Sequence, residues 1–353
     1  MRFRDGKSSR FLISIIVTSG FSRFNRTSCM RRRFILSIFG ALLCALSSLA
    51  NAQTGAYPSK PVRIIVGFPP GSATDVAARR VAVKLTASMG QSFVVENRPG
   101  ASGNIAGETV AKSAPDGYVL YAGTTSEMAI NKPGGMKMRF DPAKDFMPIG
   151  LLFTTNPVLI ASNASSLTSL RGLVDTAKAK PGQVSWATVN AFQQVVMASF
   201  QNAAAINLNM IYYKGTALAM NDVVGGQVDG MVGYPAESVP QIEAGRARAL
   251  AIAGTRRNPF LPNTPTLIEL GYPGLDLVVW GGIFAPTGTP AVIVEQLNRG
   301  ILAANSQSDI KDALAKTGSE VQLYSVPEFT GFINSEIDKW AKLIKSTGIK
   351  LGE

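Results

Sequence analysis

A glycine-containing loop, Gly67–Gly71, lies between an apolar run and an amphipathic run. Of all segments of the chain, it has the residue types that most directly indicate a binding site. The apolar run Val62–Val66 predicts a buried strand, and Asp75–Met89 predicts a helix. Such a loop directs unpaired backbone N–H groups at one spot, where the helix dipole adds partial positive charge. The sequence therefore predicts that Gly71–Asp75 forms a turn that binds an anion, either a carboxylate or a phosphate.

Ordinary structural roles compete with binding at this turn and at the next strand end. Asp75 has the residue type of a helix N-cap, and its charge would repel a bound carboxylate, so we expect a structural or water-mediated role for its side chain. The hydroxyls of Thr124, Thr125 and Ser126 could cap a helix that begins near Glu127. They also follow a predicted strand, at the edge where α/β sheets bind ligands, and we favour binding.

Two charged residues later in the chain have two interpretations each. Lys214 follows a predicted strand, and it is either a solvated loop charge or a group that neutralises a dianion. Asp229 is better interpreted as an acceptor for loop amides than as a ligand contact.

Several common chemistries are excluded by residues that the chain lacks. The sequence contains no histidine, and its two cysteines, Cys29 and Cys44, both lie near the start. Without them, the remaining chain cannot form Ser-His-Asp triads, thiol nucleophiles or Cys/His zinc sites. These absences argue against most common hydrolases, and we expect a binding protein rather than an enzyme, with no metal and no cofactor.

The first 52 residues have the pattern of a secretory leader. A basic segment, Met30–Arg33, precedes the apolar run Phe34–Leu49 and the small-residue cleavage signal Ala50–Ala52. The apolar run is shorter than the roughly 20 residues that a membrane span needs. We expect residues 1–52 to be removed on export, with translation starting at Met30 or with a long two-part leader as the alternative.

Removal of this leader lowers the net charge of the chain. The whole chain has 35 lysines and arginines against 23 acidic residues, a net charge of +12. Nine of the basic residues and one of the acidic residues precede position 53, which leaves the remainder at +4. Since no cluster of basic residues beyond Arg256–Arg257 is present, we expect no nucleic-acid partner.

After residue 52, short β-rich runs alternate with amphipathic helical runs. This alternation predicts an α/β fold in which each domain has a mainly parallel sheet with helices on both faces. About 300 residues exceed one typical core, so we expect two domains. Two long extended stretches are candidates for crossings between them. They place residues 53–156 and 277–353 in domain 1, and residues 157–276 in an inserted domain 2.

An ordered set of short motifs resembles the Bug family, the TctC-like solute-binding proteins of tripartite tricarboxylate transport systems. The resemblance runs from about Tyr57 to Leu351. The motifs that carry it are Tyr57–Arg63, Pro70–Asp75, Val94–Asn104, Ala114–Tyr118, Tyr213–Gly215, Gly225–Asp229 and Phe284–Pro290.

The resemblance implies a type II periplasmic binding protein fold whose two domains close, by a hinge, on a small organic carboxylate in the cleft between them. It also implies delivery of the ligand to membrane permease subunits of a tripartite tricarboxylate-type transporter, and we expect the protein to be a monomer. The ligand-binding residues carried over by position are Phe68, Gly71, Ser72, Ala73, Thr74, Asp75, Thr124, Thr125, Ser126, Thr188, Asn190, Ala191, Lys214, Gly215 and Asp229.

Two departures from the family pattern affect ligand choice. Ser72 stands where the family commonly has a second glycine, and Thr188–Gln194 lacks the usual Gly-Asn-Gly-Thr-like turn with its histidine. The identity of the acid therefore stays open. Two alternative functions also stay open: a ligand-dependent partner of a membrane sensor, and an enzyme on the same scaffold, which the missing histidine and cysteine disfavour.

Overall fold

The computed structural model describes residues 57–351. The predicted leader, residues 1–52, lies outside this range, so its cleavage stays a prediction. None of the helices within residues 57–351 has both the length and the apolar character needed to cross a bilayer.

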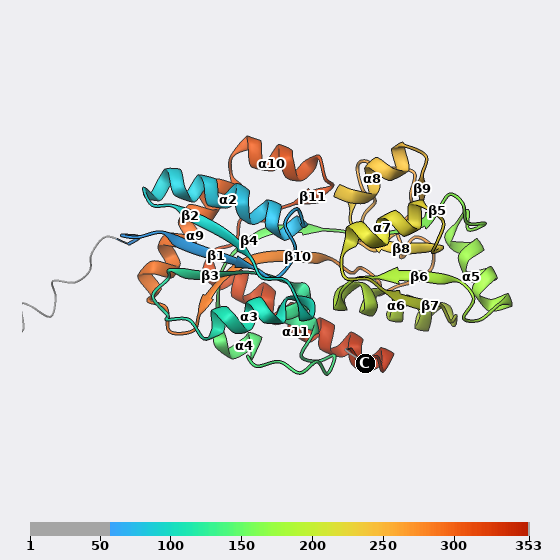
Figure 1. Ribbon diagram of the computed structural model, residues 1–353, viewed down its shortest axis with the longest axis horizontal. Coiled ribbons are helices and arrows are strands. Elements are labelled where there is room, and N and C mark those ends of the chain that lie inside the picture. Colours follow the sequence, from blue (N-terminus) through green and yellow to red (C-terminus); the bar gives the residue numbers. More distant parts are fainter. Residues whose placement is uncertain (1–56, 352–353) are drawn as a thin grey trace, which may run out of the picture. The chain divides into compact units, whose positions relative to one another are not determined.

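A six-stranded sheet, here called sheet A, contains the first and the last strand of the described chain (Figure 1). Its strand order is β11-β4-β10-β3-β1-β2. Its strands are β1 (Val62–Val66), β2 (Phe93–Asn97), β3 (Val119–Thr124), β4 (Phe146–Thr155), β10 (Val279–Pro286) and β11 (Ser319–Glu320). The helical segments that accompany it are α2 (Ala73–Met89), η1 (Ala101–Gly103), α3 (Asn104–Ala111), η2 (Ser126–Ile130), α4 (Pro142–Asp145), α9 (Ala291–Asn305), α10 (Ser308–Ala315) and α11 (Val326–Thr347).

Strand β1 is covered on both faces, which explains its unbroken apolar pattern. Val62, Ile64 and Val66 pack in a buried cluster with residues of α2 and α9. Ile65 points to the other face and belongs to a cluster with residues of α3 and α11. Because successive side chains of a strand alternate between faces, a central strand between two helical layers must be apolar on both sides.

A five-stranded sheet, here called sheet B, has the strand order β7-β6-β8-β5-β9. Its strands are β5 (Val158–Ser162), β6 (Ser185–Thr188), β7 (Asn209–Tyr212), β8 (Gly230–Gly233) and β9 (Ala247–Ile252). Its helices are α5 (Leu170–Ala179), α6 (Ala191–Ala204), α7 (Thr216–Val224) and α8 (Pro235–Glu243).

Both sheets are mixed, which corrects the expectation of mainly parallel sheets. In sheet A, β1 pairs in parallel with β2 and β3, whereas β10 is antiparallel to β3 and β4. In sheet B, β5 is antiparallel to β8 and β9. The chain leaves sheet A at the end of β4 and returns to it along β10, so these two neighbouring strands run in opposite directions. The predicted domain boundaries fall near these crossings and stay predictions.

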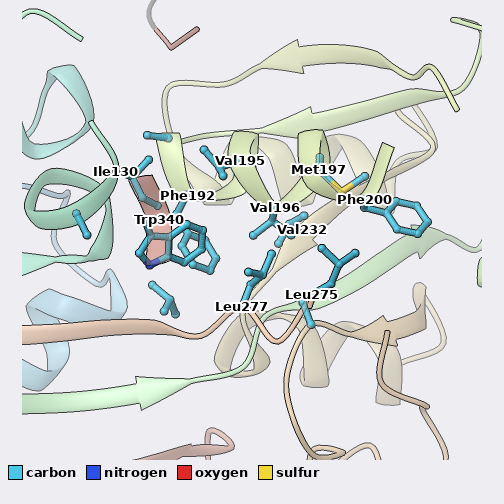
Figure 2. Close-up of a cluster of buried hydrophobic side chains, with 14 of the residues drawn as sticks. Ile130, Phe192, Val195, Val196, Met197, Phe200, Val232, Leu275, Leu277 and Trp340 are labelled. Carbon is cyan, nitrogen blue, oxygen red and sulfur yellow. The ribbon is translucent and has the colours of Figure 1, made fainter. Parts of the chain in front are cut away.

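An aromatic contact joins helix α6 of sheet B to helix α11 of sheet A (Figure 2). The buried side chains of α6 recur at helical spacing, and the face includes Phe192, Val195, Val196 and Phe200. The rings of Phe192 and Trp340 meet edge to face, with centroids 5.3 Å apart, and neither side chain is exposed. One continuous buried cluster therefore includes residues of both sheets.

Candidate functional site

A cavity of about 550 Å³ is lined by residues from both sheets and their helices. Its wall combines helix starts with a few apolar side chains. The lining residues are Phe68, Pro69, Pro70, Gly71, Ser72, Ala73, Thr74, Thr124, Ser126, Phe153, Asn190, Gly215, Thr216, Ala217, Met220, Asn221, Tyr234, Ala236, Glu237, Pro240, Gln241 and Val279.

The N-terminus of α2 contributes two free backbone amides to this wall. Ser72 is the N-cap, and its side chain accepts a hydrogen bond from the amide of Asp75 at 3.3 Å. Within residues 57–351, the amides of Ala73 and Thr74, the first two positions of the helix, have no hydrogen-bond partner. Because both residues line the cavity, these N–H groups and the helix dipole are available to an anion there.

Asp75 lies behind this loop and does not line the cavity. Its side chain, 3% exposed, accepts bonds from the Gly71 amide at 2.9 Å, from Arg79 at 3.0 Å and from the Asn97 amide group at 2.9 Å. Burial raises the pKa of the Asp75 carboxyl, but these hydrogen bonds outweigh burial and hold it below its ordinary value. Asn97 also donates to the Phe68 carbonyl at 2.9 Å, so the whole loop is braced from one side.

The N-terminus of α7 reaches the same cavity from sheet B. Its N-cap is Gly215, which offers no side chain to cap the helix. Among the described residues, the amides of Thr216 and Ala217 have no partner, and both residues line the cavity. Lys214, immediately before, is exposed and lies outside the lining. The free donors at this end of the cavity are therefore backbone amides rather than a lysine.

Helix α6 also begins at the cavity, but side chains of the same segment already accept hydrogen bonds from the backbone amides at its start. Asn190 accepts a bond from the Gln193 amide at 3.0 Å, and Gln193 accepts one from the Val189 amide at 2.7 Å. The Asn190 amide group donates to the Tyr234 hydroxyl at 3.3 Å, which leaves the Tyr234 proton free to donate into the cavity. Thr188 and Ala191 are buried beside this start and lie outside the lining.

Strand β3 ends at the cavity with a buried carboxyl behind it. The Thr124 hydroxyl donates to Glu127 at 2.7 Å, and the Tyr121 hydroxyl donates to the same carboxyl at 2.8 Å. Burial raises the pKa of Glu127 to about 7, although these donors lower it. The Thr124 oxygen also accepts a bond from the Ser126 amide at 3.4 Å, which leaves this hydroxyl one lone pair for another donor. Thr125 instead accepts a bond from the Trp280 amide at 2.9 Å and fixes β10.

Asp229 lies away from the cavity. Its carboxyl accepts bonds from the amide and hydroxyl of Ser185 and from the hydroxyl of Ser165, each at 2.8 Å. These bonds tie the start of β6 to the loop after β5, which is a structural use of the side chain.

The structure thus brings nine of the sequence-predicted site residues to one cavity: Phe68, Gly71, Ser72, Ala73, Thr74, Thr124, Ser126, Asn190 and Gly215. Six others are outside its lining: Asp75, Thr125, Thr188, Ala191, Lys214 and Asp229. Their roles as ligand contacts stay predictions.

From the sequence, Tyr234 could be considered only as one of several aromatic side chains able to pack against an acid, and neither Glu237 nor the strands that cross between the sheets were assigned to the site. Tyr234 and Glu237 lie at the start of α8, whereas Phe153 and Val279 lie on β4 and β10. The α8 residues had a usable signal, because they follow a strand and open a helix, as Gly71–Asp75 does. The strands that cross between the sheets had no such signal in the sequence, because the apolar pattern of a strand does not indicate which of its residues border a cavity.

Within residues 57–351, no group of three or more His, Cys, Asp or Glu side chains is arranged to hold a metal ion. Glu237 is the one charged side chain of this described part that lines the cavity. It accepts a bond from the Tyr234 amide at 3.1 Å, and burial raises the pKa of its carboxyl to about 7.

Comparison with known families gives a match over residues 77–349 to the model of the tripartite tricarboxylate transporter family receptor, TctC. The chain belongs to the TctC family. It is 34% identical to protein BugT of Bordetella pertussis over 320 residues, which are 90% of this chain and 98% of BugT. It is 33% identical to a UPF0065 protein of Pseudomonas sp. over 317 residues, 89% of this chain and 94% of that protein.

Solved structures of other TctC-like proteins have the same fold. An R. palustris protein with adipate matches at a TM-score of 0.79 with 32% identity, over 83% of this chain and 99% of that one. MatC from Rhodopseudomonas palustris with bound malate matches at 0.77 with 28% identity, over 82% and 100%. BugD, a periplasmic binding protein, matches at 0.75 with 31% identity, over 83% and 99%.

These findings confirm the resemblance to Bug proteins and the two-domain α/β class of the fold. TctC-family proteins are periplasmic solute-binding proteins rather than enzymes, which confirms the expectation that this chain is not an enzyme. The protein has a solute-binding role.

Proposed function

We propose that this protein captures a small organic carboxylate in the 550 Å³ cavity and delivers it to a tripartite tricarboxylate-type membrane transporter. One observation carries the proposal: the free amides of α2 and α7 both face this cavity, one helix packing on sheet A and the other on sheet B. Relatives of the same family that were solved with adipate and malate support a carboxylate ligand. Export to the periplasm after removal of residues 1–52 belongs to the same proposal.

Helix termini are suited to this task because they attract an anion without a formal positive charge. Each terminus contributes partial positive charge and N–H groups that need no reorganisation. Hydrogen bonds to a charged acceptor stabilise the complex by about 1.5–3 kcal/mol each. A ligand that accepts bonds from both helices links the two sheets, and we propose that this link favours a closed arrangement through movement at the β4–β5 and β9–β10 connections.

A thermal-shift screen of the protein starting at Gln53 tests the proposal. The panel contains mono-, di- and tricarboxylates, aromatic acids and amino acids, with the primary amide of each acid as the matched control. A ligand at 100 times its Kd stabilises the folded state by about 2.7 kcal/mol, which raises the Tm by several degrees. We expect one or more acids to do this while their amides do not. No shift with any acid, and no acid copurified with the protein, would refute the proposal.

A further inference from the structure

The carboxyl of Glu237 is placed at the cavity in a way that its structural role does not fully explain. Glu237 is at the third position of α8, and one of its oxygens, Oε1, accepts a bond from the Tyr234 amide at 3.1 Å. This bond caps the helix, as glutamates at this position commonly do. It uses one oxygen, so the second carboxyl oxygen remains available to another donor.

No cation of the described chain neutralises this carboxyl. Among the ion pairs of residues 57–351, none includes Glu237. Arg80 lines a smaller adjoining cavity of about 260 Å³ to which Glu237 also contributes, but no ion pair joins the two side chains. A carboxylate with few donors in a partly dehydrated wall is unfavourable until a cation or a strong donor reaches it.

The hydroxyl of Thr124 adds a second acceptor to the same wall. Its proton is donated to Glu127 at 2.7 Å and its oxygen accepts a bond from the Ser126 amide at 3.4 Å, so one lone pair remains. The cavity therefore has two kinds of polar group: donors, which are the free amides at the starts of α2 and α7 and the Tyr234 hydroxyl, and acceptors at Glu237 and Thr124. A molecule that satisfies both kinds must carry an anionic group and a donor group.

We propose that Glu237 makes this cavity selective for carboxylic acids that also carry an ammonium group, and that it disfavours dicarboxylates. The inference rests on the proposed function, because it assumes that a carboxylate occupies the α2 and α7 amides. An ammonium group at Glu237 forms a charge-assisted hydrogen bond and neutralises the half-buried carboxylate. A second carboxylate at the same place meets a like charge in a medium of low polarity, which weakens binding.

Matched pairs of ligands test this selection. Each pair has one carboxylate in common and differs at the far end: succinate and 4-aminobutanoate, glutarate and 5-aminopentanoate, adipate and 6-aminohexanoate. Isothermal titration calorimetry at pH 8 gives the Kd of each. For the pair whose length fits, we expect the amino acid to bind at least tenfold more tightly than the diacid. In Glu237→Gln, which keeps an oxygen for the Tyr234 amide, we expect that preference to fall at least tenfold.

Glu328→Gln is the matched control variant. Glu328 occupies the corresponding position of α11, where it accepts a bond from the Ser325 amide at 2.8 Å, is exposed and lies outside the cavity lining. We expect this variant to have the ligand preference of the unmodified protein. Circular dichroism melting establishes that both variants are folded.

The outcomes separate this inference from the proposed function. Diacids that bind as tightly as their amino acid partners, or a preference that is unchanged in Glu237→Gln, would overturn the inference and leave carboxylate binding intact. Equal weakening of every ligand in Glu237→Gln would also overturn it, because that result indicates a purely structural role. Failure of every acid to bind would refute the proposed function itself.

Discussion

The helices α2 and α7 both begin at the cavity, but they are held in different ways. The start of α2 is braced by Ser72 and by Asp75, whose carboxyl accepts bonds from Gly71, Arg79 and Asn97. The start of α7 has Gly215 as its N-cap and no side-chain cap. Two helix ends that present the same kind of donor thus differ in how their geometry is maintained.

This difference indicates that the two sides of the cavity contribute to ligand binding in different ways. The α2 loop is fixed by its own hydrogen bonds before any ligand arrives, so it loses little freedom on binding. Among the described residues, the amides at the start of α7 lack protein partners, as those of Ala73 and Thr74 do, but no side chain caps the start of α7. We infer that α2 provides a preformed half-site and that α7 completes the site when the ligand binds.

The largest expected effect comes from removing the brace. Asp75→Ala deprives the Gly71 amide, Arg79 and the Asn97 amide group of their common acceptor. Because several hydrogen bonds to one buried carboxylate are lost together, we expect the free energy of unfolding to fall by about 2–4 kcal/mol and ligand affinity to fall at least tenfold. Urea unfolding and calorimetry measure the two quantities.

Asp309→Ala serves as the control for this change. Asp309 pairs with Lys84 at 2.6 Å on the surface and contributes nothing to the cavity lining. We expect its stability and affinity to stay close to those of the unmodified protein. If Asp75→Ala behaved like this control, the α2 loop would not depend on its brace and the comparison with α7 would fail.

A smaller effect on stability is expected from straining the α2 loop. Gly71 has φ +84°, in the left-handed region that valine strongly disfavours, and an added Cβ would meet no atom within 4 Å. Gly90, at the far end of the same helix, has φ +72° and equally open surroundings. We expect Gly71→Val and Gly90→Val to lose similar stability, about 1–3 kcal/mol, because both force the same backbone conformation on a branched residue.

Ligand affinity should separate the two valine variants. Since Gly71 lines the cavity and Gly90 does not, we expect calorimetry to show at least tenfold weaker binding in Gly71→Val alone. Equal affinities in the two variants would show that the conformation of this loop does not affect ligand binding.

The sequence was most informative where a local pattern determines the structure. The α2 loop follows from a buried strand, a glycine-containing turn and an amphipathic helix, all within Val62–Met89, and its nearby residues do line the cavity. The α/β class follows from the same alternation along the chain. Asp75 illustrates the limit, because its residue type suits either a brace or a ligand contact, and only the contacts with Arg79 and Asn97 distinguish them.

Features that depend on distant segments were not predictable in this way. The mixed pairing of both sheets results from β4 and β10 crossing in opposite directions, which no local pattern records. The contribution of Phe153 and Glu237 to one cavity depends on how the elements around sheet A and sheet B meet. The contact of Phe192 with Trp340 likewise joins residues that are 148 positions apart in the sequence.

The most direct test of the two-helix account removes one free amide at a time. Proline is tolerated at the first position of a helix, where it deletes an N–H group that the helix does not use. Ala73→Pro and Thr216→Pro do this in α2 and α7, and the extended conformations of Ser72 and Gly215 are compatible with a following proline. Ala291→Pro, at the exposed start of α9, is the matched control away from the cavity.

The measurement is the Kd of the tightest-binding acid for these three variants, determined by calorimetry, with melting curves to establish folding. We expect Ala73→Pro and Thr216→Pro each to bind about tenfold or more weakly, with Tm values close to that of the unmodified protein. We expect Ala291→Pro to bind normally. Unchanged affinity in both cavity variants, in proteins that remain folded, would contradict the claim that these two helix starts hold the carboxylate.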